Sequence, residues 1–240
     1  MMQIQWKKSH WTKEDYQILR QYLISIQEEA YQKFQMKLIP NAKNLLGIRM
    51  PKLYQIAKEI ARGNIEEFIL QSQNDFYEEI MICGLVIGEC THFTEVCLHL
   101  DKYIFRIDNW AICDSVCSHL KIFRRYPEEG FTYLLSKLKM QSEYHLRFVL
   151  VMLLCHYIKQ PFIKRVLQII EQIDTQYYYV KMAQAWLSAE CIICFEKESL
   201  YLLEVLPDWT AHKTIQKLRE SKKVTKDKKL FYQTYRRKET

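Results

Sequence analysis

Hydrophobic residues recur along the chain at the three- and four-residue intervals that are typical of amphipathic helices. The first such run, which Thr12 can cap and which has acidic residues in its opening turn, is Ile18, Leu19, Tyr22, Leu23 and Ile26. No stretch shows the bounded alternation of hydrophobic and polar residues that predicts a β-strand. The pattern therefore predicts an all-α protein.

Capping residues and prolines mark where later helices begin. The predicted helices, each with the residue that opens it, are 52–62 (Pro51), 143–157 (Ser142), 162–173 (Pro161), 177–195 (Asp174 or Thr175) and 209–221 (Asp208). Each is about 10–18 residues long and is followed by a short joint, which predicts stacked helical hairpins.

A faint internal period supports this stacking. Segments that begin at Glu79, Cys113, Arg147 and Lys181 follow one another at intervals of 34 residues. This spacing lies within the range of α-solenoid repeats. It predicts that Asp114, Arg147 and Lys181 come from equivalent helices of successive repeats, which line the concave surface of a solenoid.

Composition agrees with a helical protein. Only 5 Gly and 5 Pro occur in 240 residues, which argues against a turn-rich β protein, and 49% hydrophobic residues suffice for a large core. The longest apolar runs are shorter than the ~20 residues that span a bilayer, and Met1–Trp11 has no signal-peptide core. Eight cysteines without a disulfide framework indicate reduced thiols. We therefore predict a cytoplasmic protein without a membrane partner, folded as a single repeat domain over 1–240.

Positive charge is concentrated at the C-terminus. The net charge is +7, and residues 211–240 hold 11 Lys or Arg against 3 Asp or Glu, so this segment carries +8 and the rest −1. A concentrated basic segment favours nucleic acid or an anionic surface as the partner. The alternative is a solvated helical tail that aids solubility. Within this segment, 222–240 is a candidate mobile tail.

Candidate chemistry comes from Trp110 and Asp114, which lie four residues apart. On a helix, positions i and i+4 share one face, so the ring and the carboxylate point the same way. A carboxylate beside an aromatic wall can stabilise a cationic, sugar-like transition state. The alternative is a buried Trp next to a solvated or capping Asp.

The cysteines do not predict a metal site. Cys191 and Cys194 have the spacing of a redox or zinc half-site, but no second pair or nearby His completes it. Buried thiols are the favoured interpretation. Cys83, Cys90 and Cys97 recur every seven residues, which predicts one helix face. We expect neither a metal nor a cofactor.

Two further features concern packing. Gly84 and Gly88 in an apolar helix predict close approach of neighbouring helices. The aromatic run Tyr177–Tyr179 can either stack on bases or pack between repeats, and packing is favoured at a helix start.

Five segments, in chain order, resemble motifs of one known family, the DNA alkylation repair family of AlkD-like HEAT-repeat DNA glycosylases. Gly47 and Pro51 resemble its Gly-x-x-x-Pro turn, and Trp110 and Asp114 resemble its Trp-x-x-x-Asp helix. His145–Phe148 resembles its segment with an active-site Arg, and Tyr179–Trp186 resembles its helix with a second active-site Trp. His212–Ser221 resembles its basic C-terminal helix.

The resemblance implies an α-solenoid of HEAT-like (ARM-type) antiparallel helix pairs that form a concave, positive groove for duplex DNA. It implies hydrolysis of the N-glycosidic bond of N3- or N7-alkylated purines by a monomer. Asp114 would stabilise the oxocarbenium-like sugar, Trp110 and Trp186 would flank the deoxyribose, and Arg147 would contact a phosphate or hold Asp114. The candidate DNA-binding residues are Arg49, Lys181, Lys213, Lys217, Lys222 and Lys223.

Two other function classes stay open. One is a non-catalytic HEAT-repeat protein that recognises damaged or branched DNA through phosphates, and the other is a protein-binding repeat scaffold with an incidental basic tail. Asp114 discriminates an enzyme from a DNA binder, since a phosphate binder has no use for a carboxylate in its groove. Salt dependence discriminates DNA from protein partners.

Overall fold

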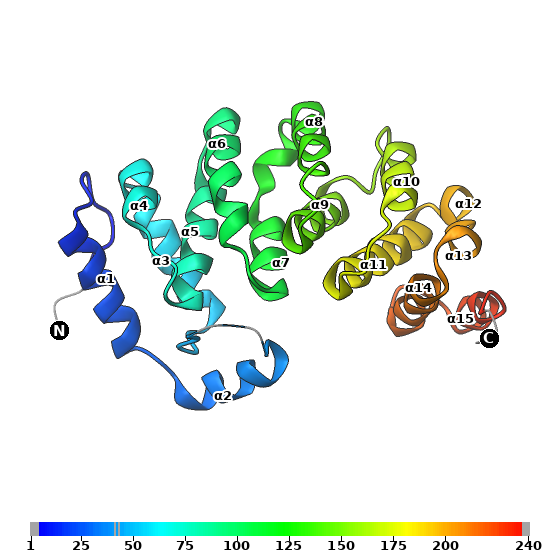
Figure 1. Ribbon diagram of the computed structural model, residues 1–240, viewed down its shortest axis with the longest axis horizontal. Helices are drawn as coiled ribbons and strands as arrows, with labels where there is room; N and C mark the ends of the chain where they lie inside the picture. Colours follow the sequence, from blue (N-terminus) through cyan, green and yellow to red (C-terminus); the bar gives the residue numbers. More distant parts are fainter. Residues whose placement is uncertain (1–4, 41, 43, 237–240) are drawn as a thin grey trace. The chain divides into compact units, whose positions relative to one another are not determined.

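The computed structural model describes residues 5–40, 42 and 44–236, so Arg237 and Lys238 of the basic tail lie outside the described residues. Over these ranges the chain is built from helices without a β-strand, which confirms the predicted all-α class (Figure 1). The chain forms two compact units, one up to Tyr126 and the other from Pro127 onward, and each is described by itself.

The first unit contains seven α-helices and two 3-10 turns among its described residues. They are α1 (Lys13–Ser25), α2 (Glu29–Leu38), α3 (Met50–Ile60), α4 (Ile65–Gln71), α5 (Tyr77–Glu89), α6 (Phe93–Tyr103), η1 (Ile104–Arg106), α7 (Trp110–His119) and η2 (Lys121–Arg124). Helix α5 is buried along almost its whole length because α3, α4, α6 and α7 all pack against it. This helix is therefore the centre of the unit's core.

Glycines let the neighbours of α5 approach closely, as predicted. A Cβ on Gly84 would overlap the side chains of Tyr103 on α6 and Val116 on α7. A Cβ on Gly88 would lie 2.5 Å from Cδ2 of His119, at the end of α7. Side chains at these two positions would force α6 and α7 away from α5.

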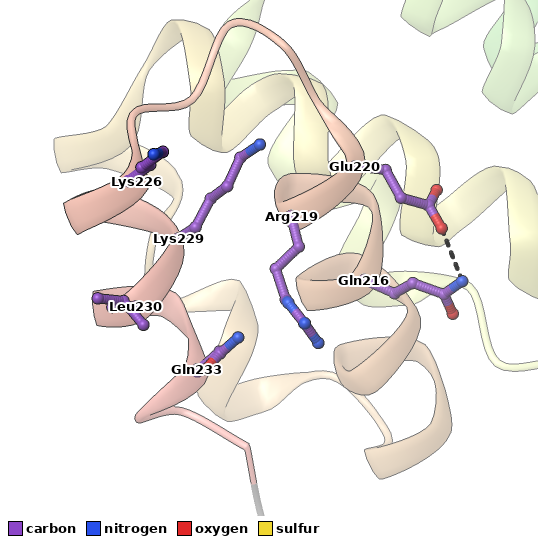
Figure 2. A pocket seen from close by; sticks show the side chains of 7 residues that line it. All are labelled: Gln216, Arg219, Glu220, Lys226, Lys229, Leu230 and Gln233. Atoms are coloured by element: carbon purple, nitrogen blue, oxygen red, sulfur yellow. Dashed lines mark hydrogen bonds between the residues drawn. The ribbon is translucent and has the colours of Figure 1, made fainter.

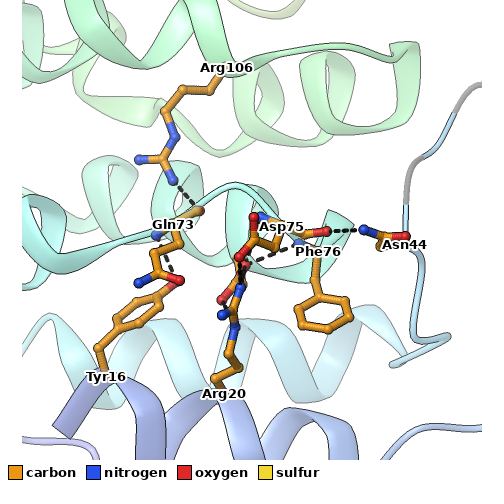
Figure 3. A network of polar contacts seen from close by, with 8 residues as sticks. Tyr16, Arg20, Asn44, Gln73, Asp75, Phe76 and Arg106 are labelled. Atoms are coloured by element: carbon orange, nitrogen blue, oxygen red, sulfur yellow. Dashed lines mark hydrogen bonds and ion pairs between the residues drawn. The ribbon is translucent and has the colours of Figure 1, made fainter. Parts of the chain in front are cut away.

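A polar network ties α1 to the loop before α5 (Figure 3). The Arg20 guanidinium on α1 donates from Nε to Oε1 of Glu79 at 3.0 Å and is also paired with Asp75. The Glu79 carboxylate, which is 2% exposed, accepts the backbone N–H groups of Asp75 and Phe76, each at 3.0 Å. The buried charge of Glu79 is thus matched by one cation and two N–H groups.

A second buried carboxylate shapes the turn before α3. The side chain of Glu78 on α5 accepts the backbone N–H groups of Leu46, Gly47 and Ile48, the last two at 2.9 and 3.2 Å. Burial raises the pKa of Glu78, and the three N–H groups act against that rise. Gly47 has a φ of 82°, and a Cβ there would lie 2.6 Å from the backbone nitrogen of Gln32. Only glycine fits this position.

The second unit contains α8 (Pro127–Lys137), α9 (Glu143–His156), α10 (Ile163–Gln172), α11 (Tyr178–Cys194), α12 (Glu196–Ser199), α13 (Leu202–Val205), α14 (Asp208–Glu220) and α15 (Lys226–Gln233). Helix α11 packs against α9 and α14 with the most extensive contacts in the unit, and α10 and α12 cover it as well. Helices α9, α11 and α14 therefore form the inner layer of this unit.

The repeat spacing predicted from the sequence matches the helices. Helices α5, α7, α9 and α11 begin 33 to 35 residues apart. Asp114, Arg147 and Lys181 each lie in the first five residues of their helix, which confirms equivalent positions. Together with the helix pairs in each unit, this spacing supports a solenoid of helix pairs.

One sequence prediction about this region was wrong. Cys83, Cys90 and Cys97 do not share a helix face, because α5 ends at Glu89 and Cys90 is its C-terminal cap, whereas Cys97 belongs to α6. Sequence spacing alone could not detect the break between the two helices. The helix starts were predicted to within two residues, and Thr12 does cap α1 through a reciprocal pair of hydrogen bonds with Asp15.

Candidate functional site

The start of α7 carries the predicted aromatic–carboxylate pair. Asn109 caps the helix, because its side-chain oxygen accepts the backbone N–H of Ile112 at 3.0 Å. Its amide also donates to Oδ1 of Asp108 at 2.8 Å, and Asn109 is only 1% exposed. The first residue after this rigid cap is Trp110, and Asp114 follows one turn later.

Trp110 and Asp114 are both half-buried. Other α7 side chains anchor the helix, since Ile112, Cys113, Val116 and Cys117 are fully buried. Trp110 and Asp114 therefore stay partly accessible on a helix that these buried side chains fix in the core. A ring and a carboxylate held in this way can contact a small substrate group from one direction.

In the second unit, Arg147 joins α9 to the start of α11. It is 5% exposed, its Nη1 donates to the backbone oxygen of Tyr179 at 2.6 Å, and its guanidinium lies 6.0 Å from the Tyr179 ring centroid. One turn earlier, Oε1 of Glu143 accepts the N–H of Tyr179 at 3.1 Å. Glu143 and Arg147 thus bind both polar backbone groups of Tyr179. The sequence did not indicate Glu143 as a candidate site residue.

Trp186 lies two turns beyond Tyr179 on the same face of α11, and it is half-buried. Glu190 follows one turn later and forms an ion pair with Lys223 at 2.9 Å. This carboxylate raises the pKa of Lys223. Tyr179, Trp186 and Glu190 therefore mark a line along α11, with Arg147 at one end and Lys223 at the other.

A basic and aromatic cluster surrounds Trp209 at the start of α14. The Nζ atoms of Lys181 and Lys213 lie 4.9 and 5.7 Å from the Trp209 ring centroid. The exposed ring of Tyr178 meets Trp209 edge to face at 5.7 Å. Two predicted DNA-binding lysines are thus brought together around one indole, which can stabilise cations over its face. The sequence did not indicate Trp209 as a candidate site residue, because Lys181, which lies beside it in the fold, is distant from it along the chain.

The other predicted DNA-binding residues are placed differently. Arg49 lies in the first unit, where it forms an ion pair with Glu28 at 2.9 Å and lies 4.6 Å from the Tyr31 ring centroid. Lys217 pairs with Glu220 at 3.3 Å, and Lys222 is exposed. Such surface pairs are weak, about 0–1 kcal/mol, so they can exchange for a phosphate.

The two pairs of predicted catalytic residues belong to different units. Trp110 and Asp114 lie on α7 of the first, and Arg147 and Trp186 lie on α9 and α11 of the second. Trp110, Asp114 and Arg147 lie near the start of their helices, and Trp186 lies in the middle of α11.

The structure offers no candidate metal centre in the part that it describes, where no three His, Cys, Asp or Glu residues cluster. None of the eight cysteines forms a disulfide; Cys191 is buried, and Cys194 is exposed rather than buried as the sequence favoured. In the same part of the chain, no helix is long and apolar enough to cross a membrane.

Comparison with known proteins identifies the family of this chain. A family model described as DNA alkylation repair enzyme matches residues 19–190, well over half of the chain. The match includes Trp110, Asp114, Arg147 and Trp186 and stops before α14 and α15. No curated protein matches the chain. On the strength of the family match and the all-helical fold, the chain belongs to the DNA alkylation repair enzyme family.

Proposed function

We propose that this member of the DNA alkylation repair enzyme family hydrolyses the N-glycosidic bond of N3- and N7-alkylated purines in duplex DNA. The family supports a repair enzyme with DNA as its substrate. The observation that carries the finer proposal is the pair on α7: a half-buried ring and a half-buried carboxylate, one turn apart, behind a buried cap. We further propose that the protein acts as a monomer, without a cofactor, in the cytoplasm.

The proposed reaction needs little general-acid catalysis from the protein. An alkylated purine already carries a positive charge, so the C1′–N bond breaks as its electron pair neutralises the departing base. Water adds to C1′ and loses a proton, which leaves a free base and an abasic site. What the reaction needs is stabilisation of the oxocarbenium-like sugar, which glycosidases also obtain from carboxylates.

Asp114 fits this need. A carboxylate about 4 Å from a developing positive charge, at an effective dielectric constant near 20, contributes about 4 kcal/mol. This amount corresponds to roughly a thousandfold in rate. In the proposal Asp114 also orients the attacking water.

The remaining residues have supporting roles. Trp110 and Trp186 flank the deoxyribose, and the indole faces favour its developing charge. In the proposal Arg147 contacts a phosphate of the DNA. Lys181 and Lys213 contact phosphates beside Trp209.

The proposal is tested with a duplex that contains one N7-methylguanine. We expect Asp114→Asn to slow single-turnover excision at least about a hundredfold while DNA affinity changes only severalfold, because the charge acts on the transition state. Trp110→Ala and Trp186→Ala should also slow excision. The matched control is Asp174→Asn, which removes an exposed carboxylate from the loop before α11 and should leave the rate unchanged.

A rate for Asp114→Asn equal to that of Asp174→Asn would contradict the role of Asp114. Tight binding of duplex DNA by the wild-type protein without base release would replace the enzyme with the non-catalytic DNA binder.

A further inference from the structure

A groove lies between α14 and α15, outside the residues that match the family model. It has a volume of ≈ 570 Å³ and is shown in Figure 2. Arg219 extends from α14 into the space between the two helices. From α15, Lys226, Lys229 and Gln233 line the opposite side.

The orientation of α15 is set by its other face. Tyr232 is 3% exposed and packs in a hydrophobic cluster with Ile215 and Leu218 of α14. Its hydroxyl donates to Glu196 at 2.7 Å, and Nζ of Lys228 donates to the same carboxylate at 2.6 Å. Because Tyr232 and Lys228 contact Glu196 from the other side of α15, the stripe at i, i+3, i+4 and i+7 that begins at Lys226 faces the groove.

The groove is strongly positive. Three cations line it, Arg219, Lys226 and Lys229, against one carboxylate, Glu220. That carboxylate is bound by Gln216 at 2.8 Å and by Lys217 at 3.3 Å. Among the described residues, the three cations have no ion pair that neutralises them. A concave surface lined by one sign of charge attracts a polyanion.

This surface adjoins the cluster around Trp209, because Gln216 and Arg219 line both the groove and a neighbouring pocket that contains Trp209 and Lys213. Lys217 and Arg219 are two residues apart, so they leave α14 on nearly opposite sides. Lys217 contacts Glu220, and Lys223 reaches Glu190 on α11, whereas Arg219 faces α15. The basic C-terminal segment, one continuous feature in the sequence, therefore presents its cations on more than one side of α14.

We propose that the groove between α14 and α15 is a second DNA contact, which binds the phosphate backbone of the duplex through Arg219, Lys226 and Lys229. The positive charge of the groove favours a polyanion, and DNA is the substrate that the family indicates. The inference rests on that substrate, which the proposed function shares, but it does not depend on base excision. Phosphate contacts carry no base information, so the groove adds affinity rather than sequence preference.

The first experiment measures binding of an undamaged duplex by fluorescence anisotropy over a range of salt concentrations. Replacing all three groove cations by Gln should flatten the log–log salt slope by about 2–3 units, since each phosphate contact contributes about one. The control triple variant, Lys139→Gln, Lys164→Gln and Lys197→Gln, removes the same charge from exposed positions of the same unit. It should change the slope by less than about one unit. Equal changes in the two variants would overturn the inference.

A second experiment reports contact directly and does not alter charge. A photo-reactive benzoylphenylalanine replaces Leu230, which lines the groove and is 63% exposed, or, as the control, Val205 on α13, which is 57% exposed. Irradiation with a labelled duplex should cross-link the variant at 230 and not the one at 205. Equal or absent cross-linking at both positions would overturn the inference.

The two proposals fail separately. A protein that releases no alkylated base but shows the expected salt slopes and cross-link would refute the glycosylase and keep the groove. A protein that releases the base with unchanged salt slopes would do the reverse.

Discussion

Asn109→Ala tests whether the cap of α7 positions the chemistry that we propose. The substitution removes the oxygen that accepts the Ile112 N–H at 3.0 Å and the amide that donates to Asp108. It leaves Trp110 and Asp114 unchanged. Because Asn109 is 1% exposed, water does not readily replace the lost partners.

The expected loss of stability follows from this burial. Replacing a capping Asn by Ala costs about 1 kcal/mol on average and up to about 2. The unpaired, buried N–H of Ile112 places Asn109 near the upper value. For a chain of this size, about 2 kcal/mol lowers the melting temperature by about 4–8 °C. A shift of the helix start by about 1 Å also misplaces the reacting groups, which can slow catalysis by tenfold or more.

The assay compares Asn109→Ala with Asn64→Ala at a temperature well below both melting transitions. Asn64 caps α4 in the same unit through the equivalent hydrogen bond, accepting the Glu67 N–H at 3.1 Å, and α4 carries no predicted site residue. Both variants should lose stability, but only Asn109→Ala should excise N7-methylguanine at least about tenfold more slowly. Asn109→Ser, which restores a cap, should recover most of the rate. If Asn109→Ala is destabilised and still excises at the wild-type rate, the cap does not position the site.

Three predictions concern the scaffold. Arg20→Met leaves the buried Glu79 carboxylate without its cation and should cost about 3–5 kcal/mol in urea unfolding; a loss below 1 kcal/mol would contradict the role of the pair. Gly47→Ala should cost at least about 1–2 kcal/mol in the same assay, because φ is 82° there and the new Cβ would overlap backbone atoms; wild-type stability would show that the turn can change. The Lys228 ammonium holds the pKa of Glu196 below its ordinary value, so the stability from this pair is present at neutral pH and is lost as the pH falls through the lowered pKa. The stability difference between wild type and Lys228→Gln should be under about 1 kcal/mol, because both groups are partly exposed. This difference should shrink as the pH falls from about 6 to about 3; a constant difference would exclude a charge effect.

Local signals in the sequence were enough to predict where several helices begin. Thr12 caps α1 because a short polar side chain before an acidic turn can satisfy the first N–H groups, and this depends on nothing outside the segment. Gly84 and Gly88 also predicted close packing, since small residues in an apolar helix leave room only for a neighbour. The start of α11 was less clear, because Tyr177 rather than Asp174 or Thr175 precedes its first turn.

Contacts between distant segments could not be predicted. The pairing of Lys223 with Glu190 joins residues 33 apart in the chain, so the charge pattern alone could not separate it from Arg219. The same holds for Lys181 and Trp209, which come together only because α11 packs against α14. The individual candidate site residues were readable as a motif, and the Asn109 cap is also a local feature, whereas Glu143 and Trp209 acquire their roles from packing.

The central claim, that the protein releases alkylated purines, is tested most directly by identifying what it liberates from alkylated duplex DNA. The purified protein is incubated with N7- or N3-methylpurine duplex, and the released material is identified by chromatography and mass spectrometry while abasic sites are counted in the DNA. Our account predicts free methylated purine base and abasic sites in equal molar amounts, and neither product above background with Asp114→Asn. Release of no base, or release of a nucleotide or of the methyl group alone, would contradict it.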